Sequence, residues 1–196
     1  TGFHPGTDVI IEGVGEGHDT VHVNGGQHYD FQLTANLEDL YYTSVTHGWF
    51  YGDEYIHRRL IGNNENNVID FQSNAPYGGL LDGGVGADTL RGSHSGDVYV
   101  VDNIGDVVDE RGPSEFGGRD EVRSFISYTL GSKLEDLTLL GSASTAGYGN
   151  ASNNKLDGAQ STGANTLYGG AGNDTYRIGG GDVVSETAGN GYDQVE

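Results

Sequence analysis

The chain has 196 residues, among them 35 glycines, 3 prolines and no cysteine, so disulfide frameworks and thiolate metal sites are excluded. Its 29 acidic residues outnumber its 9 basic ones, and the net charge of −20 argues against nucleic acid and anionic membranes as partners. No apolar run reaches transmembrane length, so membrane insertion is not expected. The charge leaves two interpretations open: a surface that binds hard cations through oxygen ligands, or the acidic surface of a halophilic protein.

Glycine-spaced units of nine residues begin near the N-terminus. Residues 14–22 (VGEGHDTVH) place Asp19 at the sixth position, and residues 62–70 (GNNENNVID) place Asn67 there. The short apolar runs between such turns predict strands of about three to five residues. An amide is a poorer cation ligand than a carboxylate. We therefore expect the turn at Asn67, and its counterpart at Asn154, to form calcium-independent coils whose amides bond to neighbouring turns.

An aromatic insertion near residues 43–61 separates these two units. It contains Trp49, Tyr51 and Tyr55 beside acids and arginines, a combination that carbohydrate- and protein-binding loops use. The alternative is that the segment folds down and covers a thin core. Its histidines and acids could transfer protons, but no nucleophile motif accompanies them, so we predict no active site.

The centre of the chain holds three nonapeptides in phase, at residues 83–91, 92–100 and 101–109. The first, GGVGADTLR, fits the pattern G-G-x-G-x-D-x-U-x, where U is a large apolar residue, and so does GGAGNDTYR at residues 169–177. This pattern marks calcium-binding β-helix repeats. Two complete matches are a much more specific signal than one glycine motif.

The spacing suits calcium, because glycines let the backbone turn its carbonyls to one side while the aspartate adds a charged oxygen. Two nonapeptides make one coil, so half-sites are expected two repeats apart: Asp88 with Asp106, and Asp174 with Asp193. The alternative for each aspartate is a turn-forming role without a metal. The predicted metal-site residues are Gly83, Gly84, Gly86, Asp88, Asp97, Asp106, Gly169, Gly170, Gly172, Asp174, Asp182, Asp193, Asp19 and Asp120.

A longer repeat contains these units. The element D-V-V-x-E occurs at residues 106–110 and 182–186, and DVIIE at residues 8–12 corresponds to it. We divide the chain into a first module at 1–82, a second at 83–168 and the start of a third at 169–196. Because it ends inside a repeat, we expect a fragment of a longer protein. The alternating residues 122–130 predict one longer strand.

Over nearly its whole length the chain resembles the secreted RTX (repeats-in-toxin) proteins, through the nonapeptides, the D-V-V-x-E elements and the L-E-D-L elements. The resemblance implies an all-β fold, a right-handed parallel β-roll or β-solenoid whose glycine–Asp turns bind Ca²⁺. It also implies export through the type I secretion channel of a Gram-negative bacterium, and folding in extracellular calcium. Crowded carboxylates repel one another until a cation neutralises them, so binding would drive folding.

We therefore expect a non-catalytic calcium-binding module of a secreted or cell-surface protein. One alternative is a module that binds extracellular polysaccharide or a surface protein through the segment around Trp49. Another is the non-catalytic part of an extracellular polysaccharide-modifying enzyme or an adhesin. A glycan titration followed by Trp49 fluorescence tests the first alternative, and a catalytic domain elsewhere in the parent protein would indicate the second.

Overall fold

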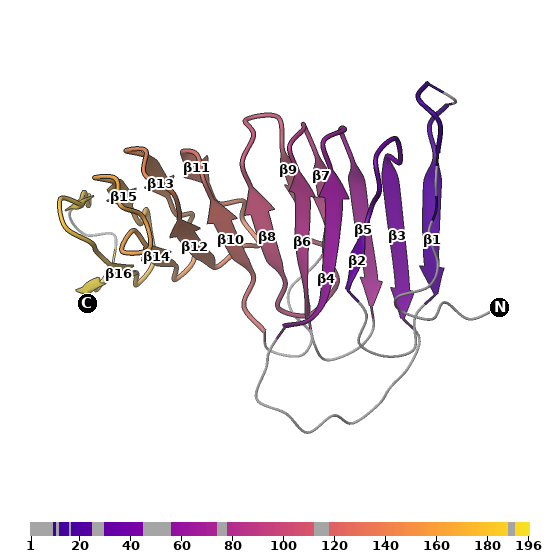
Figure 1. The fold of residues 1–196 in the computed structure, drawn as a ribbon. Coiled ribbons are helices and arrows are strands. Elements are labelled where there is room, and N and C mark those ends of the chain that lie inside the picture. The colour runs from indigo at the N-terminus through magenta and orange to yellow at the C-terminus, as the bar shows by residue number, and fades with distance from the viewer. Residues whose placement is uncertain are drawn as a thin grey trace. The chain divides into compact units, whose positions relative to one another are not determined.

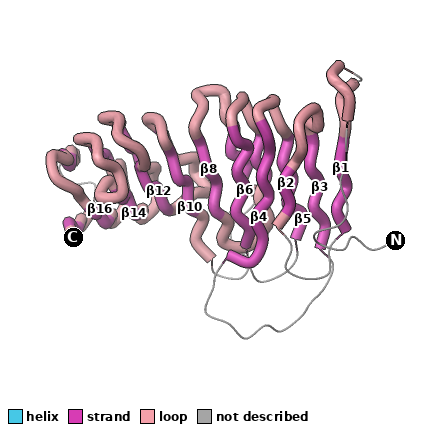
Figure 2. Tube along the Cα trace, in the orientation of Figure 1, coloured by secondary structure: helices cyan, strands magenta, loops and turns pink. Residues whose placement is uncertain are grey.

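The computed structural model describes residues 10, 12–15, 17–24, 30–44, 56–73, 78–111, 118–187 and 191–196. Within these ranges every regular element is a β-strand, and Figure 2 shows the strands joined by loops and turns. The described residues contain no helix, and therefore none long and apolar enough to cross a membrane. The predicted all-β class is confirmed.

The chain forms two compact units, Thr1–Gly118 and Arg119–Glu196. The strands of the first unit are β1 (Thr20–Asn24), β2 (Phe31–Gln32), β3 (Asp39–Ser44), β4 (Ile56–Asn63), β5 (Val68–Ser73), β6 (Gly78–Gly84), β7 (Thr89–Arg91), β8 (Val98–Val101) and β9 (Val107–Asp109). Those of the second are β10 (Glu121–Ser124), β11 (Tyr128–Thr129), β12 (Asp136–Leu139), β13 (Ala146–Tyr148), β14 (Lys155–Asp157), β15 (Thr166–Tyr168), β16 (Thr175–Arg177), β17 (Val183–Val184) and β18 (Gln194–Val195).

In the first unit, consecutive strands alternate between two parallel sheets (Figure 1). One sheet has the order β1-β3-β5-β7-β9, and the other contains β2-β4-β6-β8. Pairing joins residues one coil apart, such as Thr89 with Val107. The coil between these two residues is therefore two nonapeptides long, as predicted, whereas the coil that pairs Asp39 with Val68 is longer.

The second unit repeats this arrangement. Its strands alternate between the order β10-β12-β14-β16-β18 and the order β11-β13-β15-β17, and every pair is parallel. Parallel strands wound in successive coils form a β-solenoid, so the predicted parallel β-roll architecture is confirmed in both units.

The core of each unit is a thin layer of stacked apolar side chains between its two sheets. Strand pairing aligns these side chains in columns, one residue per coil. The eighth residue of a nonapeptide occupies such a column, as Leu90, Tyr99 and Tyr176 do, and each is fully buried. The columns include Val21, Leu40, Ile69 and Leu90; Leu60, Leu81 and Tyr99; and Val122, Leu137, Leu156 and Tyr176.

The prediction of one long strand over residues 122–130 is wrong. The chain bends after Ser124, whose hydroxyl donates to the Ile126 carbonyl at 2.8 Å and accepts from the Ile126 N–H at 3.2 Å. These bonds hold a tight corner, so β10 and β11 belong to different sheets. Alternation of apolar residues continues through the corner and therefore does not mark it.

Candidate metal centre

A ladder of acidic and amide side chains runs along one row of turns in the first unit. One such residue precedes each strand of the β1-β3-β5-β7-β9 sheet, and at three of the four steps its side chain accepts the backbone N–H of the corresponding residue in the coil before. The Asn67 N–H donates to Asp88 Oδ1 at 2.7 Å, and the Asp88 N–H donates to Asp106 Oδ1 at 3.0 Å. The Asp19 N–H donates to Glu38 Oε2 at 2.8 Å. The ladder is Asp19, Glu38, Asn67, Asp88 and Asp106.

The second unit carries the same ladder in the same order. The Asn154 N–H donates to Asp174 Oδ1 at 2.8 Å, and the Asp174 N–H donates to Asp193 Oδ1 at 2.9 Å. The Asp120 N–H donates to Glu135 Oε2 at 2.9 Å. The ladder is Asp120, Glu135, Asn154, Asp174 and Asp193. Asp88 and Asp106, which were predicted to share one site, thus stand in adjacent coils of the first ladder. Asp174 and Asp193, which were predicted to share another, stand in adjacent coils of the second.

At Asp106, Asn67 and Asn154 a side-chain oxygen accepts an N–H from its own turn. Asp106 Oδ2 accepts from Asp102 at 3.1 Å and from Asn103 at 3.0 Å. The side-chain Oδ1 atoms of Asn67 and Asn154 each accept the backbone N–H of the residue four positions earlier, at 2.8 Å. In these three turns the side-chain oxygen is thus satisfied by N–H groups of the same turn.

Asp88 and Asp174 differ from Asp106, Asn67 and Asn154. Each is only 1% exposed, and the Oδ2 atom of each is buried without a hydrogen-bond partner. These are the aspartates of the two complete GGxGxD nonapeptides. A buried carboxylate oxygen without a donor is strongly unfavourable unless a cation or proton satisfies it.

The glycines of the GGxGxD motif leave the surroundings of the two unpartnered Oδ2 atoms free of side chains. A Cβ atom at Gly83 would lie 2.1 Å from Asp88 Oδ2, and one at Gly169 would lie 2.2 Å from Asp174 Oδ2. The other motif glycines have positive φ angles and lie against carbonyl oxygens of the preceding coil: a Cβ at Gly84 would be 2.3 Å from the Asn63 oxygen. Gly86, Gly170 and Gly172 show the same close approach. Backbone carbonyls of the preceding coil therefore lie close against each of these turns.

Burial and neighbouring carboxylates both disfavour the ionised forms of Asp88 and Asp174. Burial raises the pKa of Asp88 to about 6; the Asn67 N–H lowers it, and the carboxylates of Asp106, Asp102 and Asp82 raise it further. Burial likewise raises the pKa of Asp174, against the Asn154 N–H, with Asp193 and Glu186 adding to the rise. A bound cation would reverse this penalty, because it favours the ionised form.

The remaining predicted ligands lie elsewhere or are already satisfied. Asp97 precedes β8 on the other sheet, and its oxygens accept the Gly79 N–H at 2.6 Å and both the N–H and hydroxyl of Ser93, at 2.7 and 3.0 Å. Asp182 precedes β17 and accepts from Asn165 at 2.8 Å and Gly179 at 2.7 Å. Asp19 and Asp120 begin the two ladders.

The aromatic residues predicted to bind a ligand, Trp49, Tyr51 and Tyr55, lie outside the described residues. Sequence reasoning missed four side chains near the two sites. The carboxylates of Asp82 and Asp102 raise the pKa of Asp88, while the side-chain oxygens of Tyr176 and Glu186 meet that of Asp174 around Gly169. The D-V-V-x-E element was a usable signal for Glu186, because Glu186 follows Gly169 by 17 residues, about one coil.

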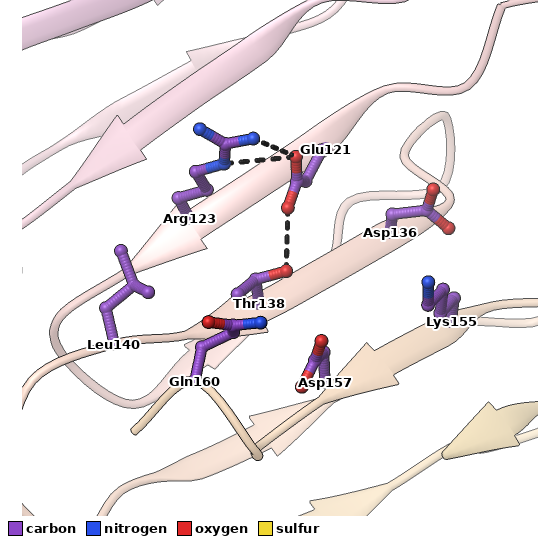
Figure 3. Close-up of a pocket in the computed structure, with 8 residues that line it drawn as sticks. All are labelled: Glu121, Arg123, Asp136, Thr138, Leu140, Lys155, Asp157 and Gln160. Atoms are coloured by element: carbon purple, nitrogen blue, oxygen red, sulfur yellow. Dashed lines mark hydrogen bonds and ion pairs between the residues drawn. The ribbon is translucent and has the colours of Figure 1, made fainter. Parts of the chain in front are cut away.

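A polar groove of about 460 Å³ lies on the outer face of β10, β12 and β14 (Figure 3). Glu121 accepts from the Arg123 guanidinium at 2.9 Å and from the Thr138 hydroxyl at 2.7 Å, as the dashed lines in Figure 3 show. Asp157 pairs with Arg177 at 3.3 Å. The acids and bases of this groove largely neutralise one another. Among the described residues that line this groove, no buried polar side-chain atom lacks a hydrogen-bond partner. The groove therefore differs from the turns at Asp88 and Asp174, where a buried oxygen has no partner.

No protein-family model, curated protein or solved structure matches the chain. The geometry of the turns therefore carries the functional assignment.

Proposed function

We propose that this chain is a non-catalytic calcium-binding module in which the turns at Asp88 and Asp174 each bind Ca²⁺, and that binding stabilises the folded solenoid. The observation that carries the proposal is the unpartnered, buried Oδ2 atom at both aspartates. Among the described aspartates of the two ladders, such an oxygen occurs only at the two complete GGxGxD turns. Asp120 is buried to the same degree but has a partner.

The donor set fits calcium. Each turn offers carboxylate oxygens and closely packed backbone carbonyls, which are the ligands that hard cations take. Calcium accepts about six to eight oxygens in flexible geometry, whereas magnesium demands a near-ideal octahedron. Asp88 with Asp106, and Asp174 with Asp193, would supply the charged oxygens.

Binding would be coupled to folding because adjacent coils supply one site. The Asp88 and Asp106 side chains lie together only when β7 and β9 are paired, so the unfolded chain has no such site. A ligand that binds only the folded state stabilises it by RT ln(1 + [L]/Kd). We propose accordingly that the chain folds in extracellular calcium after type I export from a Gram-negative cell. The absence of cysteine and the crowding of acidic residues agree with this.

The test is a calcium titration of the whole chain, starting in EDTA and followed by far-UV circular dichroism, with calorimetry to count ions. We expect a cooperative gain of β signal between about 10⁻⁴ and 10⁻³ M calcium, the range of extracellular modules. Asp88→Asn and Asp174→Asn should each remove one site. Asp109→Asn is the matched control, because Asp109 is exposed and pairs with Arg91 at 3.5 Å. A chain that binds no calcium at these concentrations would overturn the proposal.

A further inference from the structure

Three side-chain oxygens, two from the start of β16 and one from the segment after β17, converge above Gly169 in the second unit. A Cβ atom at Gly169 would lie 2.1 Å from Tyr176 Oη, 2.2 Å from Asp174 Oδ2 and 2.7 Å from Glu186 Oε1. Asp174 and Tyr176 flank the start of β16, while Glu186 follows β17 on the other sheet. Only a glycine leaves room for this meeting of oxygens.

Two of the three oxygens are unsatisfied. Tyr176 is fully buried and Asp174 is 1% exposed, and neither Tyr176 Oη nor Asp174 Oδ2 has a hydrogen-bond partner. Glu186 is exposed and accepts the Gly169 N–H at 3.1 Å. Its carboxylate is thus anchored beside the two buried oxygens while it keeps contact with solvent.

The first unit contains a matching set that satisfies itself. A Cβ atom at Gly92 would lie near Tyr99 Oη, Asp97 Oδ2 and Glu110 Oε2. There Tyr99 donates to Glu110 at 2.5 Å, and Asp97 Oδ2 accepts from Ser93. Gly170 occupies the position of Ser93 in the second unit and brings no hydroxyl to Asp174. The tyrosine and aspartate oxygens near Gly92 are therefore hydrogen-bonded, whereas the corresponding oxygens of Tyr176 and Asp174 near Gly169 are not.

We propose that Glu186 is a further ligand of the cation held at Asp174 and that Tyr176 is its positioning residue, donating to the Glu186 carboxylate as Tyr99 does to Glu110. This inference rests on the proposed calcium function. It makes the site at Asp174 different from the one at Asp88, whose repeat has Leu90 in place of the tyrosine. It also ties the turn before β16 to the end of β17, so one ion would join both sheets of the second unit.

The experiment is calorimetry of the whole chain with calcium, together with terbium luminescence excited through tyrosine. We expect Glu186→Gln to weaken one of the calcium sites about 100-fold, and Tyr176→Phe to weaken the same site about tenfold. Terbium at this site should emit strongly when tyrosine is excited, and Tyr176→Phe should remove most of that emission. Glu186→Asp keeps the carboxylate and should restore part of the affinity.

Glu121→Gln is the control, because it removes one negative charge from the outer face of the same unit. It should leave both calcium affinities unchanged. Circular dichroism in saturating calcium establishes that each variant is folded. If Asp174→Asn removes a site while Glu186→Gln binds calcium as the unmodified chain does, the role of Glu186 is overturned and the calcium function stands. If the unmodified chain binds neither ion, both proposals fail.

Discussion

At the scale of single residues, one hydrogen bond distinguishes the turns that we propose to bind calcium from their neighbours in the ladder. Asp106 and Asn67 stand in the same ladder as Asp88, yet Asp106 Oδ2 and Asn67 Oδ1 accept N–H groups of their own turns. Asp88 Oδ2 has no such donor. A carboxylate in that position destabilises the metal-free fold and gains most from an ion.

This leads to a prediction in which one substitution has opposite effects in two buffers. Without calcium, Asp88→Asn should stabilise the fold by about 1–3 kcal/mol, because it removes a buried charge without a partner for Oδ2. With saturating calcium the same variant should be less stable than the unmodified chain, because it has lost a site. Urea unfolding in EDTA and in calcium measures both effects. Destabilisation of similar size in both buffers would mean that Asp88 is only a turn residue.

The pH dependence of the metal-free chain follows from the same carboxylates. Burial raises the pKa of Asp88 and of Asp97 to about 6, above the usual 3.8. A carboxyl group whose pKa is raised by folding binds protons more tightly in the folded state. The free-energy cost of burying the ionised carboxylate is therefore absent below about pH 4 and complete above about pH 6. In EDTA, stability should fall as pH rises through this window.

Urea midpoints at about pH 4.5 and 7.5 test this, with Asp88→Asn as the comparison. The variant should show a smaller fall, which separates the effect of Asp88 from the general repulsion of a chain with net charge −20. In calcium the trend should reverse, since protons compete with the ion. If the urea midpoints of the variant and of the unmodified chain fell equally between these pH values in EDTA, the role assigned to burial at Asp88 would be contradicted.

At the scale of elements, the amide turns hold neighbouring coils together without an ion. Asn154 Nδ2 donates to the carbonyls of Leu134 at 3.3 Å and Glu135 at 3.1 Å, while its oxygen accepts the Asn150 N–H. Asn67 does the same toward Leu37 at 3.1 Å. The sequence-based expectation that these amides bond to neighbouring turns is confirmed.

Asn154→Asp should therefore destabilise the second unit in EDTA by about 1–3 kcal/mol. The new carboxylate cannot donate to the two carbonyls, and its negative charge stands beside Asp174. Asn173→Asp is a suitable control, since Asn173 is exposed and uses its oxygen to accept the Tyr192 N–H at 2.9 Å. Chemical denaturation of both variants gives the comparison. Equal stability of the two would show that the Asn154 amide donors contribute nothing.

The sequence was sufficient to predict the elements that follow from period and composition. Nine-residue spacing placed Asp88 beside Asp106 and Asp174 beside Asp193, because one coil of the roll contains two repeats. It could not place the corner after Ser124, which depends on a local side-chain bond that alternation hides. Nor could it separate Asp88 from Asp97, since both are aspartates in glycine turns and only the backbone shows which oxygen lacks a donor.

At the scale of the molecule, a solenoid distributes stability among neighbours. Each coil of the second unit pairs only with the coil before and the coil after, as β16 does with β14 and β18. Loss of one ion should therefore weaken the coils that share the site and little else, because stability in repeat proteins is close to a sum of nearest-neighbour terms.

Hydrogen exchange of Asp174→Asn in saturating calcium tests this directly. Amides of β14, β16 and β18 should exchange faster than in the unmodified chain, because the free energy of opening these coils falls when the ion is lost. Amides of β3 and β5 in the first unit should keep their protection, since the site at Asp88 still binds its ion. Asp88→Asn should give the converse pattern, with loss in β5, β7 and β9 and retention in β14 and β16. If either variant lost protection evenly across all strands, calcium would act on one cooperative fold, and the nearest-neighbour description of this chain would be wrong.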